Sequence, residues 1–68
     1  MLGAKVSEKG IIIIENRTGK IRKKIDCSRY QGAKSAIIII DNREVKVLCK
    51  DGRTRLFDID SGKLKRTL

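Results

Sequence analysis

Residues 11–25 read IIIIENRTGKIRKKI, and a second run of four isoleucines, IIII, occupies residues 37–40. Isoleucine is β-branched, so its stiff side chain favours strands over helices. The first run leads into Asn16-Arg17-Thr18-Gly19 and the second into Asp41-Asn42, and both stretches are rich in turn-forming residues. Nowhere in the chain do apolar residues recur at i, i+3, i+4 and i+7 over the length of a helix. The two isoleucine runs therefore predict β-strands.

The remainder of the chain continues this pattern of short strands and tight turns. Apolar and charged residues largely alternate from Val45 to Lys50, a period of two that indicates a strand. Asp51-Gly52 follows, a dipeptide favoured in tight hairpin turns because glycine accepts a positive φ. We therefore expect an all-β fold, an antiparallel meander of six or seven short strands. The expected strands are roughly 3–7, 11–15, 20–26, 36–41, 44–50, 53–59 and 63–67.

Four consecutive isoleucines place apolar side chains on both faces of a strand, because successive residues point to opposite faces. One sheet formed by 68 residues cannot cover both of its own faces. The strands must therefore close into a small basic β-barrel, stack as two sheets, or be covered by another chain. Full burial of one isoleucine is worth about 1.5–3 kcal/mol, so we expect that the chain is not a stable isolated monomer.

The sequence also repeats itself at an offset of 43 positions. Residues 4–25 align without gaps with residues 47–68. The dipeptide Gly19-Lys20 matches Gly62-Lys63, and nine further pairs are conservative. A period of about 40–45 residues is typical of four-stranded propeller blades.

Residues 51–68, DGRTRLFDIDSGKLKRTL, resemble the last two strands of a WD-repeat β-propeller blade. Phe57-Asp58 stands at the position of that family's Trp-Asp dipeptide, and Ser61-Gly62-Lys63 at its turn into the fourth strand. Upstream, Ile14-Glu15 stands at the same dipeptide position. The resemblance divides the single domain, 1–68, into a partial blade-like repeat and a complete one. These two repeats span residues 1–26 and 33–68.

The chain departs from the WD-repeat pattern at the family's hydrogen-bonded tetrad of His, Ser or Thr, Asp and Trp. Asp51 is kept, whereas Ala33 replaces the His and Phe57 replaces the Trp. A blade and a half does not close a ring, since propellers have about 4–8 blades. The resemblance therefore implies either a piece of a longer propeller or a subunit whose copies complete the ring.

The composition lacks residues that many catalytic and metal sites require. The chain has no His, which excludes a Ser-His-Asp triad, a Cys-His pair and an imidazole metal site. Neither a Gly-rich phosphate loop nor a nucleophile elbow is visible. Asp58 and Asp60 share a strand face, but Lys and Arg surround them and favour ion pairing over acid–base work. We therefore expect a protein that is not an enzyme and that holds no metal and no cofactor.

The N-terminus, MLGAKVSEKG, lacks a basic stretch followed by an apolar core, so no secretory signal is visible. No apolar run approaches the ~20 residues that a membrane-spanning helix needs. We therefore expect a cytoplasmic protein without a membrane span. Two cysteines alone do not decide between a disulfide and free thiols, but the absence of a secretion signal favours free, buried thiols at Cys27 and Cys49.

The chain holds 17 Lys and Arg against 8 Asp and Glu, a net charge of +9. Such a surface attracts phosphate backbones, or it keeps an edge strand soluble. The basic residues that we consider for nucleic-acid binding are Lys20, Arg22, Lys24, Arg53, Arg55, Lys63 and Lys65. In the one long connection, Tyr30 lies between Arg29 and Lys34, and we consider these three for partner binding.

Two functions follow from these observations. The first is a non-catalytic scaffold for protein–protein contact, which the WD-repeat resemblance implies, with copies of the chain or another protein as partner. The alternative is a small basic β protein that binds DNA or RNA without sequence specificity, because phosphate contacts carry no base information.

Overall fold

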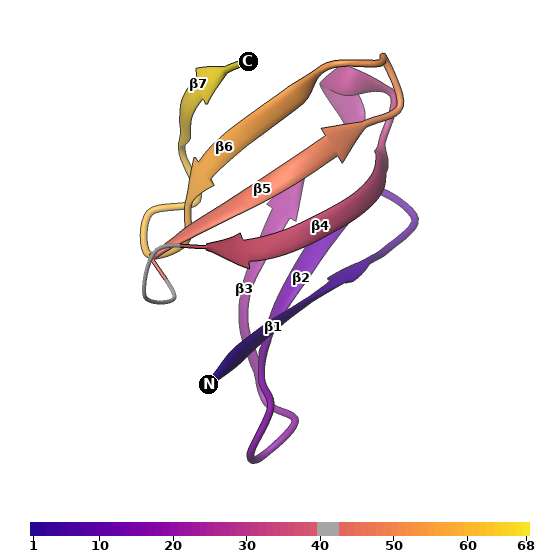
Figure 1. Ribbon diagram of the computed structural model, residues 1–68. Coiled ribbons are helices and arrows are strands. Elements are labelled where there is room, and N and C mark those ends of the chain that lie inside the picture. The colour runs from indigo at the N-terminus through magenta and orange to yellow at the C-terminus, as the bar shows by residue number, and fades with distance from the viewer. Residues whose placement is uncertain (40–42) are drawn as a thin grey trace.

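The chain folds as two antiparallel sheets in a computed structural model that describes residues 1–39 and 43–68 (Figure 1). Sheet A contains β1 (Leu2–Val6), β2 (Gly10–Glu15) and β3 (Ile21–Asp26). Sheet B contains β4 (Ala33–Ile39), β5 (Glu44–Cys49), β6 (Thr54–Asp58) and β7 (Leu64–Thr67). A 3₁₀ turn, η1 (Ser28–Tyr30), joins the sheets. The predicted all-β meander of short strands is confirmed.

The two sheets are stacked, and β4 lies against β1 (Figure 1). Among the described residues, the barrel alternative is therefore wrong. The chain crosses from one sheet to the other after β3, so β3 and β4 are not hydrogen-bonded neighbours. Strand β4 begins at Ala33, earlier than expected, because Ala33 pairs with Cys49 and its predecessor Gly32 accepts a hydrogen bond from the Lys50 N–H. Ile40 and the predicted Asp41-Asn42 turn lie outside the described residues.

The hydrophobic core lies between the sheets. Ile11 and Ile13 of β2 are fully buried there, as are Val45 and Val47 of β5. Ile12 and Ile14 alternate with the buried pair and are only partly covered. The first isoleucine run therefore serves both faces of sheet A, as its sequence predicts.

The turn between β2 and β3 has the same geometry as the turn between β6 and β7. The Gly19 N–H donates to the Glu15 carbonyl (2.7 Å), and the Gly62 N–H donates to the Asp58 carbonyl (2.8 Å). Both glycines have φ of 75°, which favours glycine over residues with a Cβ. The next residue in each turn, Lys20 or Lys63, donates its N–H to the Thr18 or Ser61 hydroxyl.

The strands that flank these turns also repeat. Ile13 pairs with Lys23 and Leu56 with Arg66, and in both hairpins the register shifts at the following residue. These positions differ by 43, as in the sequence alignment. The first strands differ by 42, because Leu2 lies opposite Glu15 whereas Glu44 lies opposite Asp58. The ungapped alignment is therefore wrong for residues 4–6, which correspond to 46–48 in structure.

Gly52 lies in the β5–β6 turn with φ of 93°. The turn is centred on Lys50 and Asp51, because the Gly52 N–H donates to the Cys49 carbonyl (3.0 Å) and the Cys49 N–H donates to the Arg53 carbonyl (2.9 Å). It is thus a longer hairpin loop than the two-residue turn that Asp51-Gly52 predicts, but its positive φ at glycine is confirmed.

Replacing Gly52 with Val is expected to destabilise the protein by about 1 kcal/mol or more, since a β-branched residue resists positive φ. A Cβ at Gly52 would meet nothing within 4 Å, so the effect isolates the backbone conformation. Denaturant unfolding at fixed protein concentration measures it. An unchanged midpoint would contradict the left-handed conformation of Gly52.

Candidate functional site

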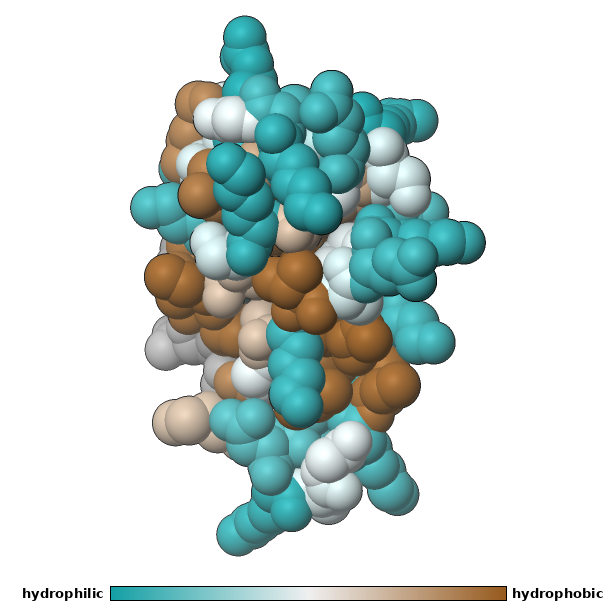
Figure 2. Space-filling view, turned by 90° about the vertical axis from the view of Figure 1, so that its right-hand side faces the viewer, coloured by the Kyte–Doolittle hydropathy of each residue, from teal (hydrophilic) through white to brown (hydrophobic). Residues whose placement is uncertain are grey.

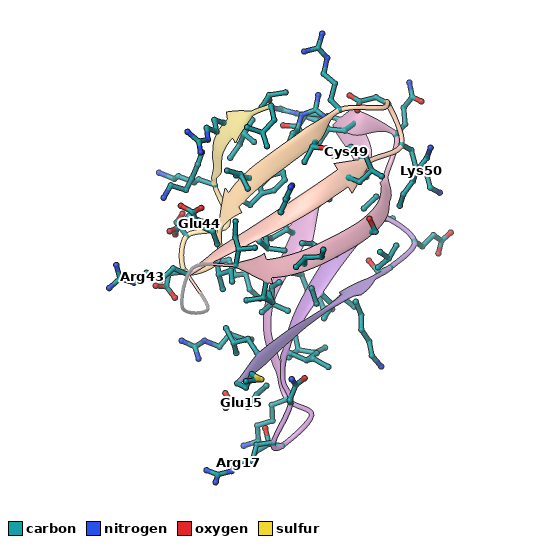
Figure 3. All side chains as sticks on the ribbon, viewed as in Figure 1. Glu15, Arg17, Arg43, Glu44, Cys49 and Lys50 are labelled. Atoms are coloured by element: carbon teal, nitrogen blue, oxygen red, sulfur yellow. The ribbon has the colours of Figure 1, made fainter. Side chains whose placement is uncertain are left out.

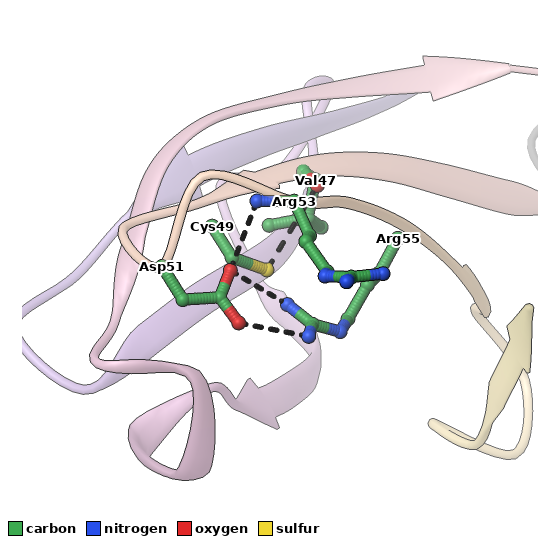
Figure 4. A network of polar contacts seen from close by, with 5 residues as sticks. All are labelled: Val47, Cys49, Asp51, Arg53 and Arg55. Carbon is green, nitrogen blue, oxygen red and sulfur yellow. Dashed lines mark hydrogen bonds and ion pairs between the residues drawn. The ribbon is translucent and has the colours of Figure 1, made fainter. Parts of the chain in front are cut away.

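One arginine, Arg55, is buried at the end of the molecule where β5 turns into β6 (Figure 4). Its exposed fraction is 7%. The guanidinium donates two hydrogen bonds to Asp51, from Nη1 to Oδ1 (3.0 Å) and from Nη2 to Oδ2 (2.8 Å). This hydrogen-bonded pair lowers the pKa of Asp51 and raises that of Arg55. Both groups are therefore charged in the folded protein at neutral pH.

The same arginine holds Tyr30 in place. Its Cζ atom lies 3.7 Å from the centre of the Tyr30 ring, a cation–π contact. The Tyr30 ring in turn meets the Phe57 ring at a centroid distance of 6.3 Å and an angle of 55°. The backbone adds a tether, since the Asp51 N–H donates to the Tyr30 carbonyl (3.2 Å). Asp51 and Arg55 thus fix the loop that connects the two sheets.

The expectation that Arg55 is a surface residue for nucleic acid is wrong. Arg55 lies opposite Val47 in the β5–β6 ladder, and both face the core. Arg53, considered for nucleic-acid binding together with Arg55, is exposed in the turn, and its backbone N–H donates to Asp51 Oδ1 (3.0 Å). The alternation of β6 directs Arg55 toward the core, because Phe57 points to the core and Arg55 lies two residues before it. Leu56 between them points to the opposite face and is also buried.

A groove of about 480 Å³ opens beside this cluster, between the end of sheet A and β6–β7 of sheet B. Of the three residues considered for partner binding, Tyr30 forms part of its wall and Arg29 is exposed at its rim. Lys34 is exposed on β4 and does not line the groove. The groove is lined by Asp26, Ser28, Arg29, Tyr30, Phe57, Gly62 and Leu64.

Both cysteines are buried, free thiols. Cys27 follows β3 and Cys49 ends β5, so the two thiols come from opposite sheets. Burial raises the pKa of Cys27 to about 11, and the neighbouring Cys49 acts in the same direction. Because the thiolate is the reactive form of cysteine, Cys27 is a weak nucleophile at neutral pH.

Basic side chains lie along β3 and β7, the edge strands of the two sheets. The Arg22 guanidinium lies 3.9 Å from carboxylate oxygens of both Glu15 and Asp60, which links β3 to the β6–β7 turn. Lys65 is paired with Glu44. Lys20, Lys24 and Lys63 are exposed and form no ion pair within residues 1–39 and 43–68. Figure 3 shows Glu15 and Arg17 near the far tip of the β2–β3 hairpin, and Arg43 and Glu44 where β5 begins.

Each sheet also has an outer face that the partner sheet does not cover. Directly paired residues of an antiparallel sheet share a face, so the ladders assign the faces. The outer face of sheet A carries Gly3, Lys5, Ile12, Ile14, Ile21 and Lys24. The outer face of sheet B carries Ile37, Ile39, Lys46, Leu48, Thr54 and Leu56. Apolar side chains form a band between charged ends on the side of the molecule seen in Figure 2.

The protein is expected to lose stability as the pH falls below about 4. The Ser28 side chain and N–H lower the pKa of Asp26, the Arg55 guanidinium lowers that of Asp51, and the Ser61 N–H lowers that of Asp58. A lowered folded-state pKa contributes stability above the unfolded value of 3.8, and this is lost as pH falls through the folded value.

Thermal unfolding followed by circular dichroism at pH 7, about 4 and about 2 measures this loss, and the midpoint should fall mainly between the last two. Asp58→Asn should show a smaller fall than the unmodified chain. A midpoint that does not change below about pH 4 would contradict the three hydrogen-bonded carboxylates.

In the described part of the chain, no group of three or more His, Cys, Asp or Glu side chains is placed to hold a metal ion. Over the same residues, no helix has the length and apolar character needed to cross a membrane.

Comparison with known proteins identifies no relative. No family model matches the chain, and neither the curated proteins nor the solved structures contain a significant match.

Proposed function

We propose that the chain is a non-catalytic scaffold module that works by protein–protein contact, as a pair of blade-like sheets that joins further copies of itself or further blades of a propeller. The observation that carries the proposal is the repeat. The β2–β3 and β6–β7 hairpins share a bulge position and a turn geometry, and the outer face of each sheet has exposed apolar side chains, Ile21 on sheet A and Ile37 and Leu48 on sheet B. The resemblance of residues 51–68 to a WD-repeat blade supports the same function.

The exposed surface supports association. The accessible area of the chain is 4667 Å². A compact monomer of this mass exposes roughly 4300 Å², so the chain has more surface than its size requires. Large exposed apolar residues contribute to it, with Ile37 exposed to 62% and Ile21 to 55%. Exposed apolar side chains of this kind occur on each of the two sheets, so each sheet offers apolar surface for association.

Native mass spectrometry and light scattering at micromolar concentration test this proposal. We expect a mass that is a multiple of the 7.7 kDa chain. A monodisperse monomer that unfolds cooperatively would contradict the self-association on which the proposal depends.

A second function, nucleic-acid binding, is favoured by the cations along β3 and β7. The surface available for it consists of Lys20, Lys24 and Lys63. Arg22 and Lys65 are each paired with carboxylates of the chain, and Arg53 is exposed in a separate turn. These side chains would contact phosphate groups, so binding would not depend on base sequence.

Affinity for a short duplex and a short single strand at two salt concentrations tests this second function. The double variant Lys24→Gln and Lys63→Gln should weaken binding equally for unrelated sequences. It should flatten the plot of log affinity against log salt by about 0.7–0.9 for each phosphate group that the variant no longer neutralises. Lys9→Gln, in the exposed β1–β2 turn, is the control and should leave the slope unchanged. If the unmodified protein does not bind at low salt, nucleic-acid binding is contradicted, and these cations serve only to solvate the surface.

A further inference from the structure

We infer that the outer face of sheet B binds the outer face of sheet A in a second copy of the chain. This inference rests on the proposed self-association and adds which surfaces meet. Its basis is that residues of the β2–β3 and β6–β7 hairpins on the two outer faces correspond, through the repeat, to residues on the two faces that meet inside the molecule.

The first step concerns the outer face of sheet B. Ile13 lies on the inner face of sheet A and is fully buried against sheet B. Its structural equivalent is Leu56, because Ile13 pairs with Lys23 just as Leu56 pairs with Arg66. Leu56 nevertheless points away from sheet A, since its neighbour Phe57 belongs to the core. Leu56 itself is only 5% exposed within one copy, so the exposed apolar residues of this face are Ile37 and Leu48. The outer face of sheet B therefore corresponds to the face of sheet A that another sheet covers.

The second step concerns the outer face of sheet A. Ile14 pairs with Ile21 directly after the bulge of sheet A, and Phe57 pairs with Leu64 directly after the bulge of sheet B. Phe57 faces sheet A in the core. Ile14 and Ile21, on the outer face of sheet A, therefore correspond to Phe57 and Leu64 of sheet B. Phe57 is the member of that pair that packs against sheet A in the core.

The third step concerns the kind of contact. The faces of sheets A and B that meet inside the chain are different surfaces, so this is a head-to-tail contact and not a two-fold one. Each copy retains one free surface of each kind. A second copy is the partner that offers the matching surface at either end. Such contacts continue from copy to copy and form a ring where the rotation closes, or a filament where it does not.

The chemistry of the faces fits this partner. Ile37 and Leu48 are exposed on the outer face of sheet B, and Ile21 is exposed on that of sheet A. Lys46, on the same face of sheet B, lies directly opposite Leu56 in the ladder, and its aliphatic stem can cover apolar surface while the ammonium reaches water. A groove of about 430 Å³ near the β1–β2 turn includes Ile12 of the outer face of sheet A in its lining.

Two single-face variants test the inference. Ile37→Glu blocks the outer face of sheet B, and Ile21→Glu blocks that of sheet A. Both isoleucines are more than half exposed, so neither change removes a core contact, and circular dichroism checks that both variants fold. Leu48→Glu gives a second variant of the sheet B face. Arg17→Glu, at the exposed β2–β3 turn, is the control and changes the charge by more than either test variant.

Each blocked variant alone should be a monomer by native mass spectrometry, while Arg17→Glu should keep the mass of the unmodified protein. Mixing Ile37→Glu with Ile21→Glu should give a one-to-one heterodimer and nothing larger, because one intact surface remains on each. Folded variants that stay apart when mixed, or an Ile21→Glu protein of unmodified mass, would overturn the inference while the proposed function stands. A monomeric unmodified chain would instead contradict the proposed function.

Discussion

Replacing Gly10 with alanine is expected to destabilise the protein by at least about 3 kcal/mol. Gly10 begins β2 and pairs with Asp26 of β3. A Cβ at Gly10 would lie 2.0 Å from the carbonyl oxygen of Ile25 and 2.8 Å from the amide nitrogen of Cys27. Both atoms belong to the backbone, so no side-chain rotation relieves the clash. The start of β2 must move away from the end of β3, which opens the core at Ile11 and Ile25.

Denaturant unfolding measures this effect, with the protein concentration held constant because association shifts apparent stability. Gly3→Ala is the matched control on β1. A Cβ at Gly3 would come within 2.5 Å of the Asn16 Oδ1 atom, but Asn16 is exposed and its side chain can rotate away. We expect Gly3→Ala to change stability by less than about 1 kcal/mol. If Gly10→Ala unfolds at the midpoint of the unmodified protein, the close approach of β2 and β3 at Gly10 is wrong.

The variant Asp51→Ala is expected to lower the thermal unfolding midpoint by about 10 °C or more. It removes the carboxylate that accepts both hydrogen bonds of the Arg55 guanidinium and leaves a buried, unpaired charge. Removal of that pair also frees the turn that holds the loop carrying Tyr30. The change at Asp51 therefore affects the contact between the sheets as well as the β5–β6 hairpin.

A second substitution separates the charge from the turn. The double variant Asp51→Ala and Arg55→Met should be more stable than Asp51→Ala alone, because replacing a buried pair with apolar groups is tolerated better than breaking it. Arg53→Ala is the control, since the Arg53 side chain is exposed and the residue bonds Asp51 through its backbone N–H. A double variant that unfolds earlier than Asp51→Ala would show that the turn, and not the unpaired charge, dominates.

The position of Arg55 could be predicted from the strand pattern of the sequence, but its charge favoured the opposite prediction. Residues 54–58 form a strand, and Phe57 lies on the face of it that points to the core. A period of two then places Arg55 on the same core-facing side. The net charge of +9 favoured a surface position instead. The partner, Asp51, lies four residues before Arg55, and only the hairpin turn brings the two together.

The repeat shows the reverse case. The ungapped sequence alignment keeps one offset throughout, whereas the structure changes the offset by one residue in the first strands. Glycine occurs at positions 19 and 62 for the same reason, since both turns need a positive φ there. The ungapped alignment matches these two glycines correctly. The loop between β5 and β6 is one residue longer than the loop between β1 and β2, so the first strands shift by one position. Conservative matches do not detect such a shift, because a one-residue slip changes the face of a side chain and not its type.

By itself the sequence determined the strands, most of their turns and the presence of apolar side chains on both faces, because β-branching, glycine and a period of two act over a few residues. Only the tertiary structure decided that the strands form two stacked sheets, that Arg55 is buried against Tyr30, and which isoleucines stay uncovered. The physical reason is that packing joins residues far apart in the chain. Alternation says that Ile13 and Leu56 each face one side of a sheet, but which side another sheet covers depends on where the chain crosses after β3.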